Sequence, residues 1–240
     1  MRATPRRFWT AAAIAPAGDG HTVTLDGREI RTPARALLVV PTAAYAEGVR
    51  AEWDAQDGAI RPDTMPLTRT ANSAIDTVGA ERARIVDMLA DFADSDLLCY
   101  RAEGPPALAA EQAAAWDPLI DWAEAALGVR FAVTSGVMPV AQPVGARQAV
   151  AARLHAAPDF ELAALHDLIH LSGSAILGLA VHAGRLAPED AWRLSRMDED
   201  WQIAEWGEDA EAAEVAAIRK SAFLHAARVL TLLGDEPSAG

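Results

Sequence analysis

The segment HTVTLDGREIRT, residues 21–32, decides the fold class of the first part of this chain. Apolar and polar residues alternate on both sides of the dipeptide Asp26-Gly27, which favours a tight β-hairpin turn. The segments Phe8–Thr10 before the hairpin and Ala36–Val40 after it have the composition of two further short strands. Together these segments predict a small, mainly antiparallel sheet, which needs helices to cover its apolar face.

The pattern changes to helical periodicity directly after Pro41. Thr42 is the expected N-cap of a helix in which Tyr45, Val49 and Trp53 recur at every fourth position and share one face. Trp53 is therefore interpreted as a structural residue. Further helices are predicted over residues 81–96, 105–127, 159–184 and 208–233, and in a segment that begins at Pro188.

Two short apolar segments, Leu97–Tyr100 and Val129–Val133, flank the helix predicted over residues 105–127. A strand, a helix and a second strand in this order allow a parallel crossover onto the amino-terminal sheet. This arrangement keeps all predicted strands in the first part of the chain.

The segment 136–145 is uncharged, contains two prolines and is the best candidate for a linker. Every periodic segment after it is predicted to be helical. We therefore predict an α+β protein, with an N-terminal domain at 1–138 whose small sheet is packed by helices. An all-α C-terminal domain at 139–240 follows.

The composition limits the classes of function. The 240 residues include 34 acidic and 21 basic side chains, a formal net charge of −13. A charge of this sign repels nucleic acid and anionic membrane surfaces, so we expect neither a nucleic-acid partner nor membrane insertion. Cys99 is the single cysteine, which excludes an intrachain disulfide bond. The sequence has no phosphate-binding loop and no nucleophile elbow, which excludes nucleotide hydrolysis by a P-loop and leaves no serine in a nucleophile motif.

Two histidines provide the alternative function. His166 and His170 are four residues apart in a predicted helix, so they share a face and could chelate one metal ion. The zinc-protease form of this motif has glutamate directly after the first histidine, whereas this chain has Asp167 there. Histidines among leucines more often pack in or near a helical core. We predict no metal site and keep a metal-dependent hydrolase as the alternative.

The segment from Met197 to Ile218 contains eight acidic residues and neither lysine nor arginine. Trp201 and Trp206 lie among these carboxylates. One interpretation is a solvated helix face, and the other is a surface that binds a cationic partner through carboxylates and aromatic anchors. Residues 1–35 instead contain six arginines against three acidic residues, so the two ends of the chain differ in the sign of their charge.

Six segments of the sequence carry a family resemblance: Arg7–Trp9, Leu25–Ala34, Glu52–Gln56, Pro66–Asp76, Ala113–Trp122 and Ser195–Glu211. In this order and spacing they resemble the assembly chaperone of the F-type ATP synthase α subunit, a family found in mitochondria and related bacteria. The resemblance implies a non-enzymatic chaperone, with no cofactor and no catalytic residues, that binds the unassembled α subunit, prevents its aggregation and promotes its assembly with the β subunit. The family's fold also agrees with the predicted order of a sheet-containing N-terminal domain and a helical C-terminal domain.

The resemblance places the family's functional acidic site in the last of these segments. With the acidic run it identifies one set of candidate partner-binding residues: Asp198, Asp200, Trp201, Gln202, Trp206 and Glu208. A monomer is expected. Because the start of the sequence has no targeting extension, we expect a bacterial cytoplasmic member of the family. Eukaryotic relatives are expected in the mitochondrial matrix instead.

Overall fold

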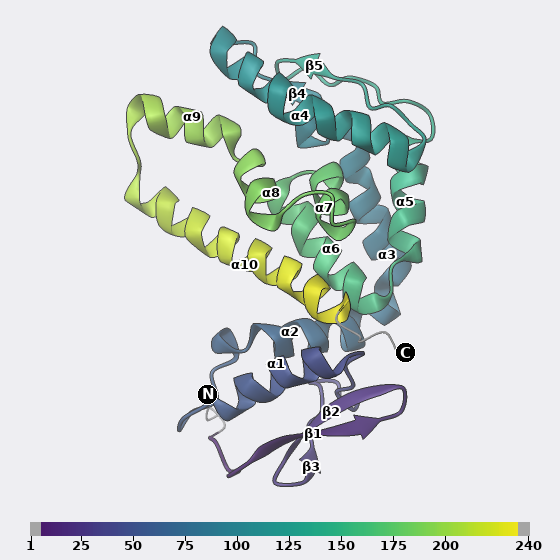
Figure 1. Ribbon diagram of the computed structural model, residues 1–240, viewed down its shortest axis with the longest axis vertical. Helices are drawn as coiled ribbons and strands as arrows, with labels where there is room; N and C mark the ends of the chain where they lie inside the picture. The colour runs from purple at the N-terminus through teal and green to yellow at the C-terminus, as the bar shows by residue number, and fades with distance from the viewer. Residues whose placement is uncertain (1–5, 235–240) are drawn as a thin grey trace. The chain divides into compact units, whose positions relative to one another are not determined.

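The computed structural model describes residues 6–234, and this part of the chain forms two compact units (Figure 1). The first unit comprises residues 6–82, 158–164 and 228–234, and the second comprises the residues between these segments. The chain crosses from one unit to the other four times. Three crossings lie within helices, which are α3 (Gly79–Ala90), α6 (Asp159–Ser172) and α10 (Ala210–Gly234), and the fourth lies between Ala157 and Pro158, just before α6.

The predicted linker at 136–145 lies inside the second unit and contains neither helix nor strand. The compact units therefore follow a different division from the predicted domains 1–138 and 139–240. The division at residue 138 is a statement about independently folding domains, which the compact units do not test, so it stays a prediction. Arg2, one of the six arginines in residues 1–35, lies outside the described residues.

The first unit is built on an antiparallel sheet in the order β1-β2-β3. Its elements are β1 (Ala12–Ala17), β2 (Gly20–Leu25), β3 (Arg28–Glu29), α1 (Ala43–Asp54), the short 3₁₀ helix η1 (Pro62–Thr64), α2 (Pro66–Ser73) and the π-helical turn η2 (Ala74–Val78).

The predicted hairpin is confirmed. β2 and β3 pair antiparallel, and the turn residues Asp26 and Gly27 have φ angles of 49° and 80°, both in the left-handed region that this tight turn requires. The other predicted strands were misplaced. The first strand is β1 rather than Phe8–Thr10, and Ala36–Val40 makes only isolated bridges to residues 31 and 21.

Helix α1 covers the sheet, as Figure 1 shows, and supplies much of this core. Thr42 caps α1 as predicted, since its Oγ1 accepts a hydrogen bond from the backbone N–H of Tyr45 at 3.1 Å. Tyr45 and Val49 of α1 are fully buried, and so are Val23 of β2 and Val40. Burial of these apolar side chains is the main stabilising contribution of the unit.

Glu52 fixes the junction between α1 and α2. Its carboxylate accepts hydrogen bonds from the backbone N–H groups of Leu67 at 2.6 Å and Thr68 at 2.8 Å, and from the Thr68 hydroxyl at 2.8 Å. A carboxylate in this position satisfies N–H groups that the first turn of a helix leaves free, and it interacts favourably with the helix dipole. Partial burial nevertheless raises the pKa of Glu52, because desolvation outweighs these hydrogen bonds.

Replacing Glu52 by alanine is expected to lower the free energy of unfolding by about 2 kcal/mol, since it removes a helix cap. Urea unfolding followed by circular dichroism measures the change. Glu47→Ala is the matched control on the same helix, because Glu47 pairs only with Arg50 at the surface and should cost about 0.3 kcal/mol. Equal losses for the two variants would contradict the capping role.

Trp53 lies against the ring of Trp9, with the ring centroids 5.3 Å apart in an edge-to-face arrangement. Trp9 is buried, and the guanidinium of Arg7 lies 5.4 Å from the centroid of its ring. Arg7 also donates hydrogen bonds to the backbone carbonyls of Asp54 and Gln56. This packing is compatible with the structural role predicted for Trp53.

The second unit is almost entirely helical. Besides parts of α3, α6 and α10 it contains η3 (Asp91–Asp94), η4 (Leu97–Cys99), β4 (Tyr100–Arg101), α4 (Pro106–Leu127), β5 (Thr134–Ser135), α5 (Ala146–Ala156), α7 (Ala175–His182), α8 (Pro188–Leu194) and α9 (Met197–Trp206). The predicted α+β class, with a small sheet near the amino terminus and a mainly helical remainder, is confirmed. Among the described residues, no helix combines the length and hydropathy needed to cross a lipid bilayer.

Two local predictions in this unit were wrong. The crossover exists, but its strands β4 and β5 pair with each other in a separate two-stranded parallel sheet instead of joining the first sheet. The single helix predicted over 159–184 is two helices, because Gly173 has a φ angle of 70° and Ser174 caps α7 through its side chain. Asp159 lies in the first turn of α6, where it pairs with Arg82.

Candidate functional site

Helices α9 and α10 form a helical hairpin within the second unit. Helix α9 ends at Gly207, whose φ of 89° is accessible mainly to glycine. Two residues later, Asp209 accepts a hydrogen bond from the backbone N–H of Ala212 at 2.8 Å and so caps the start of α10. The chain therefore reverses its direction over residues 207–209, and α10 runs back from this turn (Figure 1).

An open groove with a volume of about 740 Å³ lies between α9 and the first half of α10. On the α9 side it is lined by Arg196, Glu199, Asp200, Gln202, Ile203 and Trp206. On the side of the turn and α10 it is lined by Glu208, Asp209, Glu211, Ala212, Val215 and Arg219, together with three small residues. Each helix thus presents one continuous stripe of side chains to the groove.

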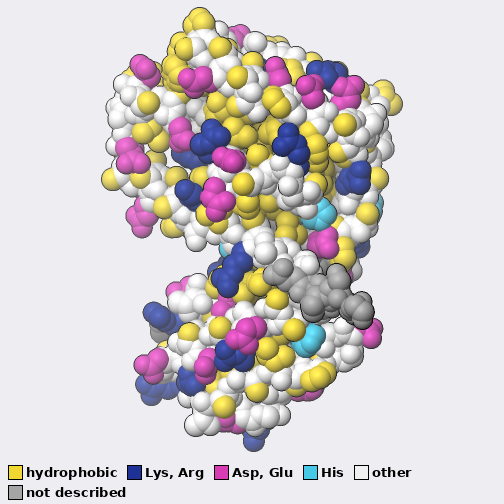
Figure 2. Space-filling view, viewed as in Figure 1, with side chains coloured by type: hydrophobic (Ala, Val, Ile, Leu, Met, Phe, Trp, Pro, Cys, Tyr) yellow, Lys and Arg dark blue, Asp and Glu magenta, His cyan; other side chains and the backbone are white. Residues whose placement is uncertain are grey.

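The floor of the groove is apolar and open to solvent. Trp206 is 81% exposed and Val215 is 51% exposed, although both are large apolar residues. Helix α9 contains no buried residue at all. In Figure 2, acidic side chains and apolar patches alternate over the part of this unit that holds α9 and α10. Such a surface leaves apolar area in water that a binding partner would cover.

The rim of the groove is mainly acidic, with five carboxylates against two arginines. Arg196 is held in place by the ring of Trp192, whose centroid lies 5.8 Å from the guanidinium carbon, and it pairs with Asp200 at 3.6 Å and Glu199 at 3.9 Å. Within residues 6–234, Glu208 and Glu211 have no ion-pair partner. Uncompensated negative charge therefore concentrates at the turn between the two helices.

The structure brings four of the six predicted partner-binding residues to this groove: Asp200, Gln202, Trp206 and Glu208. Asp198 and Trp201 do not line it. The Asp198 carboxylate accepts a hydrogen bond from Nε2 of Gln112 in α4 at 2.8 Å, and its partial burial raises its pKa. Trp201 is half-buried on the same helix. The hydrogen bond of Asp198 attaches the first turn of α9 to α4.

A buried polar network in α4 positions α9. Gln112 accepts a hydrogen bond from the backbone N–H of Ala102 and donates one to Asp198, and the Trp116 indole N–H donates to the carbonyl of Leu194 at 3.1 Å. Leu194 ends α8, and Asp198 belongs to the first turn of α9. The network therefore holds the start of α9, while the rest of that helix stays at the surface.

The α10 wall of the groove was not predicted from the sequence. Glu211, Val215 and Arg219 are spaced four apart and so form one stripe, but the alanine-rich surroundings gave no reason to separate this stripe from an ordinary solvated face. Arg196 and Ile203 were also not predicted. The four-residue spacing of Glu211, Val215 and Arg219 was the one sequence pattern that could have indicated this wall.

The histidine pair of the alternative function lies on α6. The rings of His166 and His170 are stacked with centroids 5.9 Å apart, and Nδ1 of His166 lies 2.9 Å from the carboxylate of Asp167. The His170 ring also meets Phe92 edge-on. Among residues 6–234, no group of three or more His, Cys, Asp or Glu side chains could hold a metal ion, so nothing in this region favours the hydrolase.

An open groove with an apolar floor and a charged rim is typical of surfaces that bind another polypeptide. The groove therefore favours the class of protein-binding factors. Comparison with known proteins is consistent with this class. The family model described as ATP12 chaperone protein matches residues 6–124.

Relatives extend this match over nearly the whole chain. The crystal structure of Atp12 from Paracoccus denitrificans is 44% identical, with a TM-score of 0.92, and the alignment covers 95% of this chain and 98% of that one. An aspartate-to-lysine mutant of the same protein is 43% identical, has a TM-score of 0.92 and aligns over 95% and 97% of the two chains. Protein atp12, mitochondrial, from Schizosaccharomyces pombe is 26% identical over 222 residues, which is 88% of this chain and 76% of that protein.

The chain belongs to the ATP12 chaperone family. This confirms the resemblance to ATP synthase assembly chaperones that its sequence indicated.

Proposed function

We propose that this chaperone binds the unassembled α subunit of the F-type ATP synthase, prevents its aggregation and releases it for assembly with the β subunit. The observation that supports this proposal is the groove between α9 and α10. It exposes apolar surface, and the carboxylates of Glu208 and Glu211 at its rim have no ion-pair partner inside their own unit. An unassembled subunit exposes apolar surface that its permanent partner will later cover, and such a surface needs temporary protection.

The two parts of the groove have different tasks in this proposal. The carboxylates at the rim attract and orient basic side chains of the client, which mainly raises the rate of association. The floor around Ile203, Trp206 and Val215 covers apolar side chains and provides most of the binding free energy. Release needs no nucleotide, because the permanent β-subunit interface buries more area and displaces the chaperone by competition.

The proposal includes a one-to-one complex formed by a monomeric chaperone in the bacterial cytoplasm. Mixing the purified chain with isolated α subunit tests it directly, with light scattering to follow aggregation and size-exclusion chromatography to detect the complex. We expect suppressed aggregation and a stable one-to-one complex. Failure to protect the α subunit and to form any complex with it would overturn the proposal.

Reversing the charge of Glu208 is expected to weaken binding of the α subunit about fivefold at low salt, and less at high salt, because a rim carboxylate acts through screened electrostatics. Glu205→Lys is the matched control. Glu205 is also exposed on the same hairpin but does not line the groove, and both variants change the net charge by the same amount. Calorimetric titration with the α subunit measures both, and equal weakening would place the contact elsewhere. Asp198 is unsuitable for such a test, since its carboxylate holds Gln112.

A further inference from the structure

We infer that the groove between α9 and α10 receives an amphipathic α-helical segment of the client, with its apolar side chains on the groove floor and a lysine or arginine at the turn end. The inference rests on the proposed function for the identity of the client. It adds the secondary structure, the side-chain pattern and the orientation of the segment that is bound.

The apolar requirement follows from the floor. Ile203 and Trp206 of α9 lie three residues apart on one stripe, and Val215 faces them from α10. Half or more of Trp206 and Val215 is accessible to water. A segment with apolar residues at every third or fourth position would cover both stripes at once, since that spacing repeats along one side of a helix.

The helical requirement follows from the walls. Both walls are helices whose backbone groups bond within the hairpin; the N–H of Gly207 donates to the carbonyl of Ile203 at 2.9 Å, and the N–H of Ala213 donates to that of Asp209 at 2.9 Å. An extended segment would find no strand edge in this lining to pair with. Its backbone N–H and C=O groups would therefore lose water at the apolar floor without gaining hydrogen-bond partners. A helix arrives with its backbone satisfied. The ten residues of α9 form a wall about 15 Å long, enough for about three turns of a bound helix.

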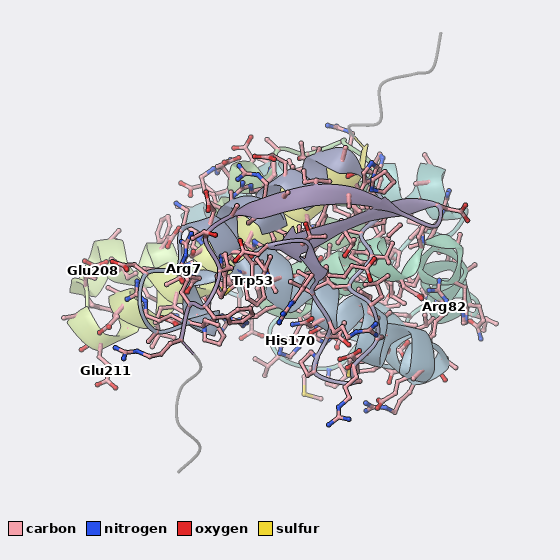
Figure 3. All side chains as sticks on the ribbon, turned by 90° about the horizontal axis from the view of Figure 1, so that it is seen from below. Arg7, Trp53, Arg82, His170, Glu208 and Glu211 are labelled. Carbon is pink, nitrogen blue, oxygen red and sulfur yellow. The ribbon has the colours of Figure 1, made fainter. Side chains whose placement is uncertain are left out.

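The orientation follows from the distribution of charge along the groove. The two arginines of the lining, Arg196 before α9 and Arg219 in the middle of α10, lie away from the turn. Glu208 and Glu211 both lie at the turn end of the hairpin, on opposite edges of its ribbon in Figure 3, and lack ion-pair partners within the described chain. A basic side chain at this end would find an unpaired carboxylate and the exposed ring of Trp206.

A second copy of the chain fits the groove less well. The amino-terminal arginines Arg28, Arg31 and Arg35 are exposed and could supply positive charge. Phe8, however, is the only large apolar side chain that is strongly exposed in residues 6–82, so this region offers no apolar stripe for the floor. Each copy also carries a net charge of −13, which opposes self-association.

The test uses a dye-labelled model peptide of leucine and lysine, about four helical turns long, with the leucines on one face and the lysines on the other. Its control is a scramble of the same composition that cannot form an apolar face. Fluorescence anisotropy measures binding of both peptides to the full chain. We expect the amphipathic peptide to bind at least about tenfold more tightly than the scramble, because only it can fill the floor.

Two matched variants locate the site. Val215→Asp changes the groove floor, whereas Ile218→Asp adds the same charge to another exposed aliphatic position on α10 that does not line the groove. We expect about tenfold weaker binding of the amphipathic peptide by Val215→Asp and less than about twofold change by Ile218→Asp. Both positions are at the surface, so circular dichroism should show an unchanged fold.

Three results would overturn the inference: equal binding of the two peptides, equal effects of the two variants, or dimerisation of the wild-type chain that Val215→Asp abolishes. The first would mean attraction by charge alone, and the last would make a second copy the occupant. If any of these occurs while the wild-type chain still binds the α subunit, the proposed function stands and only the groove assignment fails. If the wild-type chain does not bind the α subunit, the proposed function fails whatever the peptides show.

Discussion

Replacing Trp116 by alanine is expected to lower the free energy of unfolding by about 4 kcal/mol, the largest effect of any substitution considered for this chain. Trp116 is completely buried in α4, its indole N–H donates to the carbonyl of Leu194, and the guanidinium of Arg101 lies 5.0 Å from the centroid of its ring. Alanine would leave a large cavity and an unpaired carbonyl at the end of α8. Urea unfolding followed by circular dichroism measures the loss.

Trp206→Ala is the control, because it is the same substitution in a neighbouring region with an opposite environment. Trp206 is 81% exposed, so its removal should change the free energy of unfolding by less than about 0.5 kcal/mol. If Trp116→Ala does not fold, Trp116→Phe keeps most of the volume and should cost about 2 kcal/mol, mainly for the lost hydrogen bond. Similar stabilities for Trp116→Ala and Trp206→Ala would contradict the core position of Trp116.

The stability difference between the wild-type chain and the Asp96→Asn variant is expected to shift by about 2 kcal/mol in favour of the variant as the pH rises from about 4.5 to 7.5. Burial raises the pKa of Asp96 from 3.8 to about 6, although the Ser174 hydroxyl and the backbone N–H groups of Leu98 and Ile176 donate hydrogen bonds to its carboxylate. Between these two pKa values the folded chain holds more protons than the unfolded one. The stability contributed by Asp96 is therefore fully present below pH 3.8 and is lost as the pH rises through 6.

The measurement is urea unfolding of both proteins across this pH range. Other titrating groups are common to the two proteins and cancel in the difference. Asp94→Asn controls for the loss of one carboxylate from the same segment, since Asp94 is exposed two residues earlier. A difference between wild type and Asp96→Asn that does not change with pH would show that Asp96 does not titrate as its burial requires.

Features that depend on neighbouring residues in the chain were predictable. The Asp26-Gly27 turn is one example, because two consecutive left-handed residues are favourable for few dipeptides. The cap at Thr42 is another, since its hydroxyl oxygen accepts from an N–H only three residues later and needs no distant partner. The order of the family's segments belongs to the same category, and it was sufficient to predict the assembly-chaperone class.

Features that depend on distant contacts were not predictable. The start of α7 at Ser174 is held by Asp96, 78 residues away, whose buried carboxylate accepts hydrogen bonds from the Ser174 hydroxyl and from the backbone N–H of Ile176. Tyr100 and Arg101 pair with residues 134 and 135 instead of the first sheet, and nothing local distinguishes these two outcomes. In both places the decisive energy comes from burial and hydrogen bonds between segments far apart in the sequence.

The same distinction holds for the candidate site. By itself the sequence determined that carboxylates and tryptophans gather in one helical segment and that the chain resembles an assembly chaperone, because composition, spacing and motif order are local properties. Only the tertiary structure decided that Asp198 is tied to Gln112 while Trp206 is exposed in a groove whose second wall is α10. The physical reason is that a helical segment has several faces of similar composition, and the packing of α4 against one of them determines which face is left for a partner.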